Sequence, residues 1–269
     1  MLYVKPMRRI AIVSDIHSNM AALNAVLADI RTQNVQAIYC LGDVVGYGPE
    51  PIEAMRTIIE VCEGGRMIAG NHDHAVIHEP IGFNAEARNA ALWTNQVIRA
   101  GFLGLFNGKR KRWAWLRDLP TSFTEEDVLF VHASPRQHLE EYILEEHTNG
   151  RSFMGEDPKQ LLEENFSLVP HTCFIGHTHR PGVITGDDHH WHSLTTLDYH
   201  WTIDSRKTIV NVGSVGQPRD GDPRSCYVVF DGKEIVWRRV PYDIERTRKL
   251  IYDNPMLGNH LGDRLLVGR

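Results

Sequence analysis

The sequence lacks cysteine pairs, long apolar runs and an excess of positive charge. Its four cysteines contain no CxxC pair, which argues against a zinc ribbon or a dense disulfide framework. No stretch approaches the roughly 18 uninterrupted apolar residues of a membrane span. The first residues are too charged for a secretory signal. We therefore expect a cytoplasmic protein with reduced thiols and no membrane partner.

The charge balance is slightly acidic. The chain has 29 Lys plus Arg against 34 Asp plus Glu, a net charge of −5, which disfavours a mainly electrostatic nucleic-acid binder. It also lacks low-complexity linkers and solenoid repeats. Its 269 residues suffice for one large core. We expect a catalytic domain over 1–240 and a C-terminal helix and tail packed on it over 241–269.

Histidine is abundant instead. The 15 histidines outnumber the 9 phenylalanines, 8 tyrosines and 6 tryptophans. Histidine is a common metal ligand and transfers protons near neutral pH. The composition therefore points to metal or acid–base chemistry.

Strand and helix patterns alternate in the first third of the chain. Short apolar runs at 9–14 and 37–41 flank a helical pattern at 19–33, which is typical of a βαβ unit. A helical insert is predicted at about 79–125. Beyond residue 170 the pattern is one of short strands, followed by a helix at 244–252.

Five strand-like runs each end in polar residues of the kinds that bind metals. These residues are Asp15 and His17, Asp43, Asn71 and His72, His132, and His177 and His179. In α/β sheets, ligands bind outside the carboxyl ends of strands, so we expect these side chains to converge at one rim. Mixed oxygen and nitrogen donors suit first-row ions such as Mn²⁺, Fe, Co²⁺, Ni²⁺ or Zn²⁺.

In order and spacing, these motifs resemble the calcineurin-like metallophosphoesterase superfamily. The motifs are DxH at 15–17, GD at 42–43, GNHD at 70–73, a lone His132 and GHTH at 176–179. Residues 41–49 and 211–218 look like the bacterial branch related to diadenosine tetraphosphatases and small phosphodiesterases. The resemblance implies an α/β fold, called α+β in some schemes: a four-layer α/β/β/α sandwich of two mixed sheets flanked by helices.

The resemblance also implies roles for single residues. Asp15, His17 and His179 would hold one divalent ion, Asn71, His132 and His177 a second, and Asp43 would bridge them. His72 would be catalytic. Asp73 would either orient the His72 ring or cap a loop or helix. Such a site would hydrolyse a small substrate, a phosphomonoester, phosphodiester or nucleotide polyphosphate, by in-line attack of metal-activated hydroxide.

The chain departs from the protein Ser/Thr phosphatases of this superfamily after the GD motif. Where those enzymes have an Asp-Arg pair, it has Gly46 and Tyr47. Arg219 and Arg224 are candidates to bind phosphate instead, because a guanidinium fork matches phosphate oxygens; the alternative is that both are surface residues. Two other functions stay open: a non-catalytic, metal-stabilised binding or scaffold protein, and a nuclease.

Overall fold

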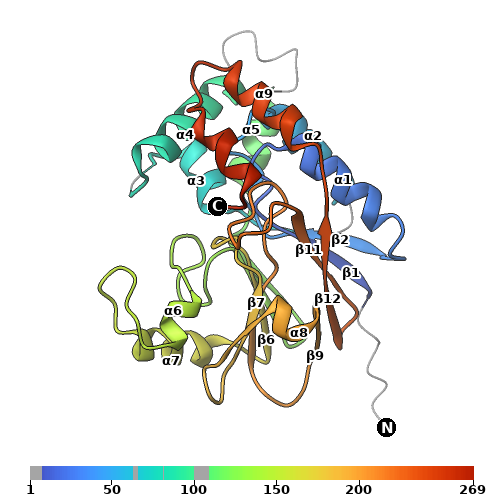
Figure 1. Ribbon diagram of the computed structural model, residues 1–269, viewed down its shortest axis with the longest axis vertical. Coiled ribbons are helices and arrows are strands. Elements are labelled where there is room, and N and C mark those ends of the chain that lie inside the picture. Colours follow the sequence, from blue (N-terminus) through green and yellow to red (C-terminus); the bar gives the residue numbers. More distant parts are fainter. Residues whose placement is uncertain (1–7, 63–65, 81, 100–108) are drawn as a thin grey trace.

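Two β-sheets pack face to face at the centre of the molecule (Figure 1). The computed structural model describes residues 8–62, 66–80, 82–99 and 109–269. Within these residues, the strands form two mixed sheets of six. Large apolar side chains of both sheets, among them Phe130, Phe174 and Phe230, fill the space between them.

The first sheet has a parallel half and an antiparallel half. Its strands in spatial order are β3 (Arg66–Met67), β2 (Ala37–Cys40), β1 (Ile10–Val13), β11 (Ser225–Phe230), β12 (Glu234–Val240) and β9 (His200–Thr202). β1 pairs in parallel with β2, as the predicted βαβ unit requires. β11 runs antiparallel to β1.

The second sheet has a parallel centre. Its strands in spatial order are β4 (Ser122–Glu125), β5 (Val128–Val131), β6 (Thr172–Ile175), β10 (Thr208–Asn211), β7 (Gly182–Thr185) and β8 (Trp191–Ser193). β5, β6 and β10 are parallel. The parallel strands of both sheets therefore supply the carboxyl ends at which a site can form.

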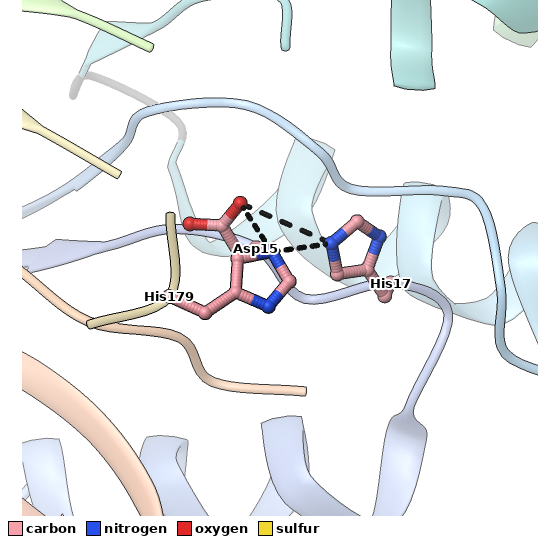
Figure 2. A group of neighbouring side chains, drawn as sticks. All are labelled: Asp15, His17 and His179. Carbon is pink, nitrogen blue, oxygen red and sulfur yellow. Dashed lines mark hydrogen bonds and ion pairs between the residues drawn. The ribbon is translucent and has the colours of Figure 1, made fainter. Parts of the chain in front are cut away.

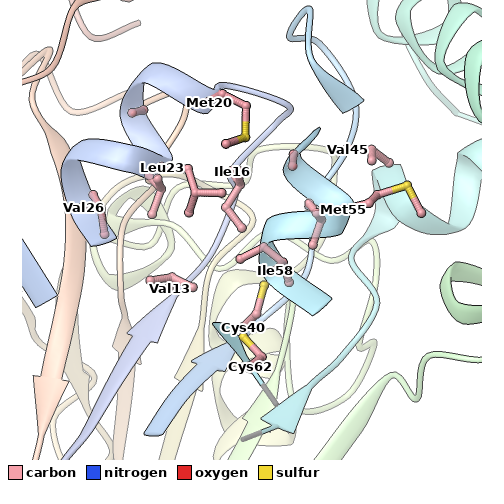
Figure 3. Packing of buried hydrophobic residues seen from close by; sticks show 14 of the residues in the cluster. Val13, Ile16, Met20, Leu23, Val26, Cys40, Val45, Met55, Ile58 and Cys62 are labelled. Carbon is pink, nitrogen blue, oxygen red and sulfur yellow. The ribbon is translucent and has the colours of Figure 1, made fainter. Parts of the chain in front are cut away.

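Helices cover the outer face of each sheet. The helices of the described residues are α1 (Met20–Ile30), α2 (Pro51–Val61), α3 (Asn71–Ile77), α4 (Ala85–Ile98), α5 (Lys109–Arg117), α6 (Glu145–Thr148), α7 (Pro158–Leu168), α8 (Leu194–Leu197), α9 (Ile244–Tyr252), α10 (His260–Asp263) and a 3₁₀ turn, Arg264–Leu266. α8 differs from the outer helices, because its Leu194 joins the core between the sheets. α1 and α2 pack on the first sheet through residues such as Leu23 and Met55 (Figure 3). α7 packs on the second sheet. The predicted α/β/β/α layering is confirmed. None of the described helices has the length and apolar character needed to cross a bilayer.

Strand β1 shows why the strand-like runs of the sequence are apolar at every position rather than alternating between apolar and polar residues. Ile10 and Ile12 belong to the core between the sheets, whereas Ala11 and Val13 belong to the core under the helices. A strand covered on both faces needs apolar residues at every position.

Several elements differ from the expectation. α3 begins within the GNHD motif, whose residues carry no helical apolar pattern. Residues 122–125, expected at the end of the helical insert, instead form β4, and β9 was not predicted. The helical part of the insert is α4 and α5; its residues 81 and 100–108 lie outside the described residues.

The segment beyond residue 240 packs back on the helical layer. α9 forms where a helix is predicted, and it contacts α10 and the 3₁₀ turn. Ile251, Leu261 and Leu265 join one apolar cluster with Tyr47, from the loop after β2. The C-terminal segment therefore reaches a loop that bears a predicted metal ligand.

Candidate metal centre and adjoining cavity

The residues expected to bind metal follow the carboxyl ends of strands. Asp15 follows β1, Asp43 follows β2, and Asn71 is the first residue of α3, after β3. His132 directly follows β5, and His177 follows β6. The sequence prediction that five strand ends carry these side chains to one rim agrees with this arrangement.

Backbone hydrogen bonds join the loops at this rim. The Asp15 N–H donates to the Gly42 carbonyl oxygen (3.1 Å), and the Gly176 N–H donates to the His132 carbonyl oxygen (2.8 Å). Asp15 also links the sheets, because one of its carboxylate oxygens accepts the His177 N–H (3.1 Å).

Two motif glycines allow these loops to approach closely. Gly42 has a φ of +96°, and a Cβ on it would overlap the backbone of Gly70. A Cβ on Gly70 would in turn overlap the Asp43 carboxylate. Only residues without a side chain bring the two loops this near.

Several predicted ligands have a left-handed backbone. They are Asp15 (φ 54°), His17 (47°), Asp43 (51°), His177 (63°) and His179 (59°). This conformation is uncommon outside glycine, and such strain costs of the order of 1–3 kcal/mol per residue. Strain gathered at one place is typical of a functional site.

Asp15, His17 and His179 form a first ligand group (Figure 2). His179 Nε2 lies 3.1 Å from His17 Nε2 and 3.2 Å from Asp15 Oδ1. His17 Nε2 lies 3.9 Å from the same carboxylate oxygen. Donor atoms at these separations can all reach one ion at about 2.0–2.2 Å.

Asn71, His132 and His177 form a second ligand group. The Asn71 Oδ1 atom lies 3.1 Å from His132 Nε2 and 3.1 Å from His177 Nδ1. An amide oxygen and two ring nitrogens therefore face one another from three loops.

Asp43 lies between the two groups. Its Oδ2 atom is 3.6 Å from His17 Nε2 in the first group and 3.4 Å from His132 Nε2 in the second. Its other oxygen, Oδ1, accepts the His72 N–H (2.8 Å). This is the position that a bridging carboxylate requires.

Backbone carbonyls fix the tautomers of the four histidines that are predicted as ligands. One ring nitrogen of each histidine faces a backbone carbonyl oxygen. The pairs are His17 Nδ1 with Val45, His132 Nδ1 with Leu41, His179 Nδ1 with Gln217 and His177 Nε2 with Glu140. A carbonyl oxygen only accepts, so each of these nitrogens carries the proton. The other nitrogen of each ring presents its lone pair to its ligand group, an arrangement common behind metal-binding histidines.

The residues present fit a pair of divalent ions. In the described part of the chain, the buried Asp15 Oδ1 has no hydrogen-bond partner, although it faces two ring nitrogens. A cation would satisfy this oxygen and the lone pairs around it. Carboxylate, amide and imidazole donors suit first-row divalent ions.

Burial and charge set the protonation of the centre. Burial lowers the pKa of His177 to about 3. Burial also opposes a charge on His132, but the Asp43 and Asp15 carboxylates outweigh it and raise the pKa of His132 to about 9. Burial raises the pKa of Asp43, yet His132 and His72 hold it well below its usual range. Ionised carboxylates and neutral imidazoles are the forms that bind metal, so a cation at this centre has to displace the proton that His132 holds in the metal-free chain near neutral pH.

His72 lies beside the ligand groups in an aromatic setting. Its ring centroid is 4.3 Å from that of Tyr47 and 4.7 Å from that of Phe83. Its Nδ1 atom is buried and, among the described residues, lacks a hydrogen-bond partner. Because a donor atom of His72 also lies within 4.8 Å of those of His17 and Asp43, distance alone does not separate a catalytic role from a ligand role.

Asp73 contacts the backbone. Its carboxylate accepts the N–H groups of Val44 (3.3 Å), Val45 (3.1 Å) and Gly70 (3.1 Å). These bonds fit the capping role expected for Asp73, whereas the described residues show no hydrogen bond from it to the His72 ring. Asp73 ties the loop after β2 to the start of α3.

We expect Asp73→Ala to lower the free energy of unfolding of the metal-free chain by about 3 kcal/mol, since three buried N–H groups lose their acceptor. Urea denaturation in the presence of a chelator measures this. Asp157→Ala, which removes a single-bond N-cap of α7, is the matched control, with an expected loss of about 1 kcal/mol. Equal losses in the two variants would contradict the role given to Asp73.

A cavity of about 470 Å³ opens beside the centre. Asn71, His72 and His177 line one part of it, and the other lining side chains include Tyr47, Phe83, Tyr142, Phe153, Met154, Arg180 and Arg219. The volume is that of a small-molecule site, and aromatic walls with few polar groups are usual in such sites.

One loop presents apolar side chains to this cavity. Phe153 is 56% exposed and Met154 is 79% exposed, although both are large and apolar. The Glu156 carboxylate fixes the loop, because it accepts the N–H groups of Phe153 (2.5 Å) and Met154 (2.7 Å) and a hydrogen bond from the ring of His147 (2.7 Å). Exposed apolar side chains held in this way indicate a binding surface.

The two arginine candidates have different surroundings. Arg219 lines the cavity, and its guanidinium carbon lies 5.8 Å from the Tyr47 ring centroid. Arg224 binds the Asp222 carboxylate with its Nε and Nη2 atoms and is not among the residues that line the cavity. Of the two candidates, Arg219 is therefore the one at hand for a substrate in this cavity.

Sequence reasoning missed most of the cavity wall. Tyr47 enters the sequence analysis only as a departure from the Asp-Arg pair of the Ser/Thr phosphatases, and Phe83 and Tyr142 are not singled out there. Phe153 and Met154 give a usable signal, because they are the large apolar residues of a stretch, 145–160, that is otherwise polar apart from glycine and proline.

The sequence was compared with known proteins. Residues 7–234 match the model of the calcineurin-like phosphoesterase superfamily domain. An uncharacterised protein of Methanocaldococcus jannaschii, MJ0912, is 35% identical over 97% of this chain and 98% of its own length. A symmetrical bis(5′-nucleosyl)-tetraphosphatase of Pectobacterium atrosepticum is 27% identical over 45% of this chain and 41% of its own length.

Solved structures share the fold. A metallophosphoesterase from Sphaerobacter thermophilus superposes with a TM-score of 0.80 and 33% identity, covering 98% of this chain and 100% of the other. The hypothetical protein PH1004 from Pyrococcus horikoshii has a TM-score of 0.72 at 18% identity, covering 97% and 98% of the two chains. The second likeness concerns the fold alone.

Proposed function

This chain belongs to the calcineurin-like phosphoesterase superfamily, and on that basis we propose that it is a dinuclear-metal-dependent phosphoesterase acting on a small phosphorylated substrate. The observation that carries the proposal is the position of the Asp43 carboxylate between the two ligand groups. A single-metal or purely structural site has no need of two ligand groups that share an oxygen.

The metals and the chain have separate tasks. When bound, two divalent ions polarise phosphoryl oxygens and generate a nucleophile from water near neutral pH. The carbonyls of Val45, Leu41 and Gln217 keep the protons of three ligand rings away from the ions. The rigid backbone of the strand ends holds the two groups at a fixed separation, which aligns attack with the leaving group.

We assign His72 to the substrate phosphoryl group rather than to a metal. Burial lowers its pKa to about 4, so its ring is neutral near pH 7 and holds one proton. It lines the cavity, and Tyr47 and Phe83 pack against it and set its orientation. A ring so placed can donate that proton in a hydrogen bond to a phosphoryl or leaving oxygen as charge develops there.

The cavity favours a nucleotide among small phosphorylated substrates. Tyr142 and Phe153 offer aromatic faces to a base, with ring centroids 5.6 Å apart. The name of the Pectobacterium relative, a bis(5′-nucleosyl)-tetraphosphatase, supports the same substrate class.

Turnover of simple esters tests the proposed function. Purified protein with added Mn²⁺ is expected to hydrolyse p-nitrophenyl phosphate or bis(p-nitrophenyl) phosphate, to stop on chelation, and to recover when metal is returned. A panel of nucleotides, cyclic nucleotides, dinucleoside polyphosphates and phosphopeptides then ranks the substrates. Metal-loaded protein that cleaves none of these would refute the proposal.

Phe153→Ala is expected to raise KM for a nucleotide about tenfold with little change in kcat, because base–aromatic stacking is worth about 1–3 kcal/mol. Steady-state kinetics with a nucleotide and with glycerol phosphate, which has no ring, measure the effect. Leu168→Ala removes an exposed apolar side chain of α7 away from the cavity and serves as the control. The same KM change for both substrates would exclude base stacking on Phe153.

A further inference from the structure

A second, larger pocket adjoins the cavity at the metal centre. Its volume is about 860 Å³, and its charged lining residues are Arg180, Arg219, Arg239, Arg264 and Arg269 with Glu145, Asp220 and Asp222. Arg180 and Arg219 line both spaces, so the two adjoin at these side chains.

Two arginines of this pocket flank one aromatic ring. The guanidinium carbons of Arg219 and Arg264 lie 5.8 Å and 5.9 Å from the Tyr47 ring centroid. Arg219 comes from the loop after β10 and Arg264 from the C-terminal 3₁₀ turn. Two positive groups are thus held at one tyrosine by segments far apart in the sequence.

Arg219 and Arg264 differ from the other arginines of the pocket in the groups to which they donate hydrogen bonds. Arg180 pairs with Glu146, and Arg239 pairs with Asp220. In the described part of the chain, Arg219 instead donates to the Gln217 side-chain oxygen and Arg264 to a main-chain oxygen of Arg269, and neither pairs with an Asp or Glu side chain.

The pair has unused capacity to bind an anion. The Nε atom of Arg219 is buried and has no hydrogen-bond partner among the described residues. Burial and the charge of Arg219 lower the pKa of Arg264 to about 10, so both groups are charged at neutral pH and repel each other. An anion between them would relieve the repulsion and take up the free donors.

The backbone couples this pair to the metal centre. The Arg219 N–H donates to the carbonyl oxygen of His179 (3.2 Å), a predicted ligand. The Gln217 carbonyl oxygen accepts the ring N–H of the same His179. An anion held by Arg219 therefore stands at a fixed place relative to the metals.

We propose that Arg219 and Arg264 form an anion clamp that binds a second anionic group of the substrate, distinct from the phosphoryl group that is hydrolysed. The inference rests on the proposed function. Arg264 lines the larger pocket but not the cavity at His72, so it reaches beyond the hydrolysed group. The substrate class is accordingly a phosphate compound with at least two anionic groups, such as a nucleotide carrying a chain of phosphates.

Binding measurements test the clamp without turnover. Calorimetric titration of the full-length, metal-free chain with inorganic pyrophosphate is expected to show binding that Arg264→Gln weakens about tenfold. Arg264→Lys keeps the positive charge but loses the two-pronged guanidinium group, and its affinity for pyrophosphate is expected to lie between those of the wild type and Arg264→Gln. Arg206→Gln removes a partly exposed arginine paired with Asp204 and controls for net charge. No pyrophosphate binding, or equal binding by all four proteins, would overturn the clamp.

Inhibition of the metal-loaded enzyme tests the second anionic group. ADP is expected to inhibit p-nitrophenyl phosphate hydrolysis more strongly than AMP, which differs from it by one phosphate. Arg264→Gln is expected to remove that preference, measured as the ratio of the AMP and ADP inhibition constants within each protein. The inference is overturned if the variant still binds ADP more tightly than AMP to the same extent, or if it loses affinity for ADP, AMP and p-nitrophenyl phosphate by the same factor. If the wild type fails to hydrolyse p-nitrophenyl phosphate, the proposed function loses this support, whereas calorimetry still decides the clamp.

Discussion

Asp43→Asn is expected to lower phosphoester turnover about a thousandfold and to leave fewer than two metal ions per chain. The Asp43 Oδ2 atom lies 3.6 Å from His17 Nε2 and 3.4 Å from His132 Nε2, one from each ligand group. An amide at this position removes a negative charge from between two cations. Because two bound cations then repel each other without a bridge, affinity for at least one of them falls.

The variant separates metal binding from folding. Asparagine has nearly the same size, and its side-chain oxygen can still accept the His72 N–H that Asp43 now accepts (2.8 Å). Elemental analysis, turnover and circular dichroism together measure the outcome. Asp118→Asn, at an exposed carboxylate of the surface, is the control. If the Asp43→Asn variant binds two ions and turns over phosphoesters at the normal rate, the bridging role of Asp43 is contradicted.

His72→Ala is expected to lower kcat about a hundredfold to ten-thousandfold while the chain still binds two ions. The reason is that His72 lines the cavity and its buried Nδ1 has no hydrogen-bond partner among the described residues, whereas each predicted histidine ligand has a ring nitrogen facing a backbone carbonyl. The substitution removes a proton donor without removing a ligand.

Metal content distinguishes the two roles that the geometry of His72 allows. His74→Ala, two residues further along α3 and outside the cavity lining, is the matched control and should change neither metal content nor kcat. Loss of one ion from His72→Ala would make His72 a ligand. Full turnover in that variant would remove it from the chemistry altogether.

The convergence of these side chains at one rim is predictable because the sequence signals for it are local. Asp15, Asp43 and His132 each end a short apolar run, and the sheet rule then brings the run ends together without further information. The layering is predictable for a related reason: strands covered on both faces, such as β1, need apolar residues throughout.

The rest of the site depends on packing between distant segments. Arg264 reaches Tyr47 because Leu261 and Leu265 bury against the same cluster, and no local pattern encodes that contact. The capping bonds of Asp73 similarly depend on the approach of the loop after β2. Single residues carry the chemistry, but tertiary contacts define the space around it.

Anomalous diffraction from crystals of manganese-loaded protein tests the central claim most directly. The account predicts two anomalous peaks, one against Asp15, His17 and His179 and the other against Asn71, His132 and His177, with the Asp43 carboxylate between them. Crystals of loaded protein with no peak within coordination distance of these side chains would contradict it.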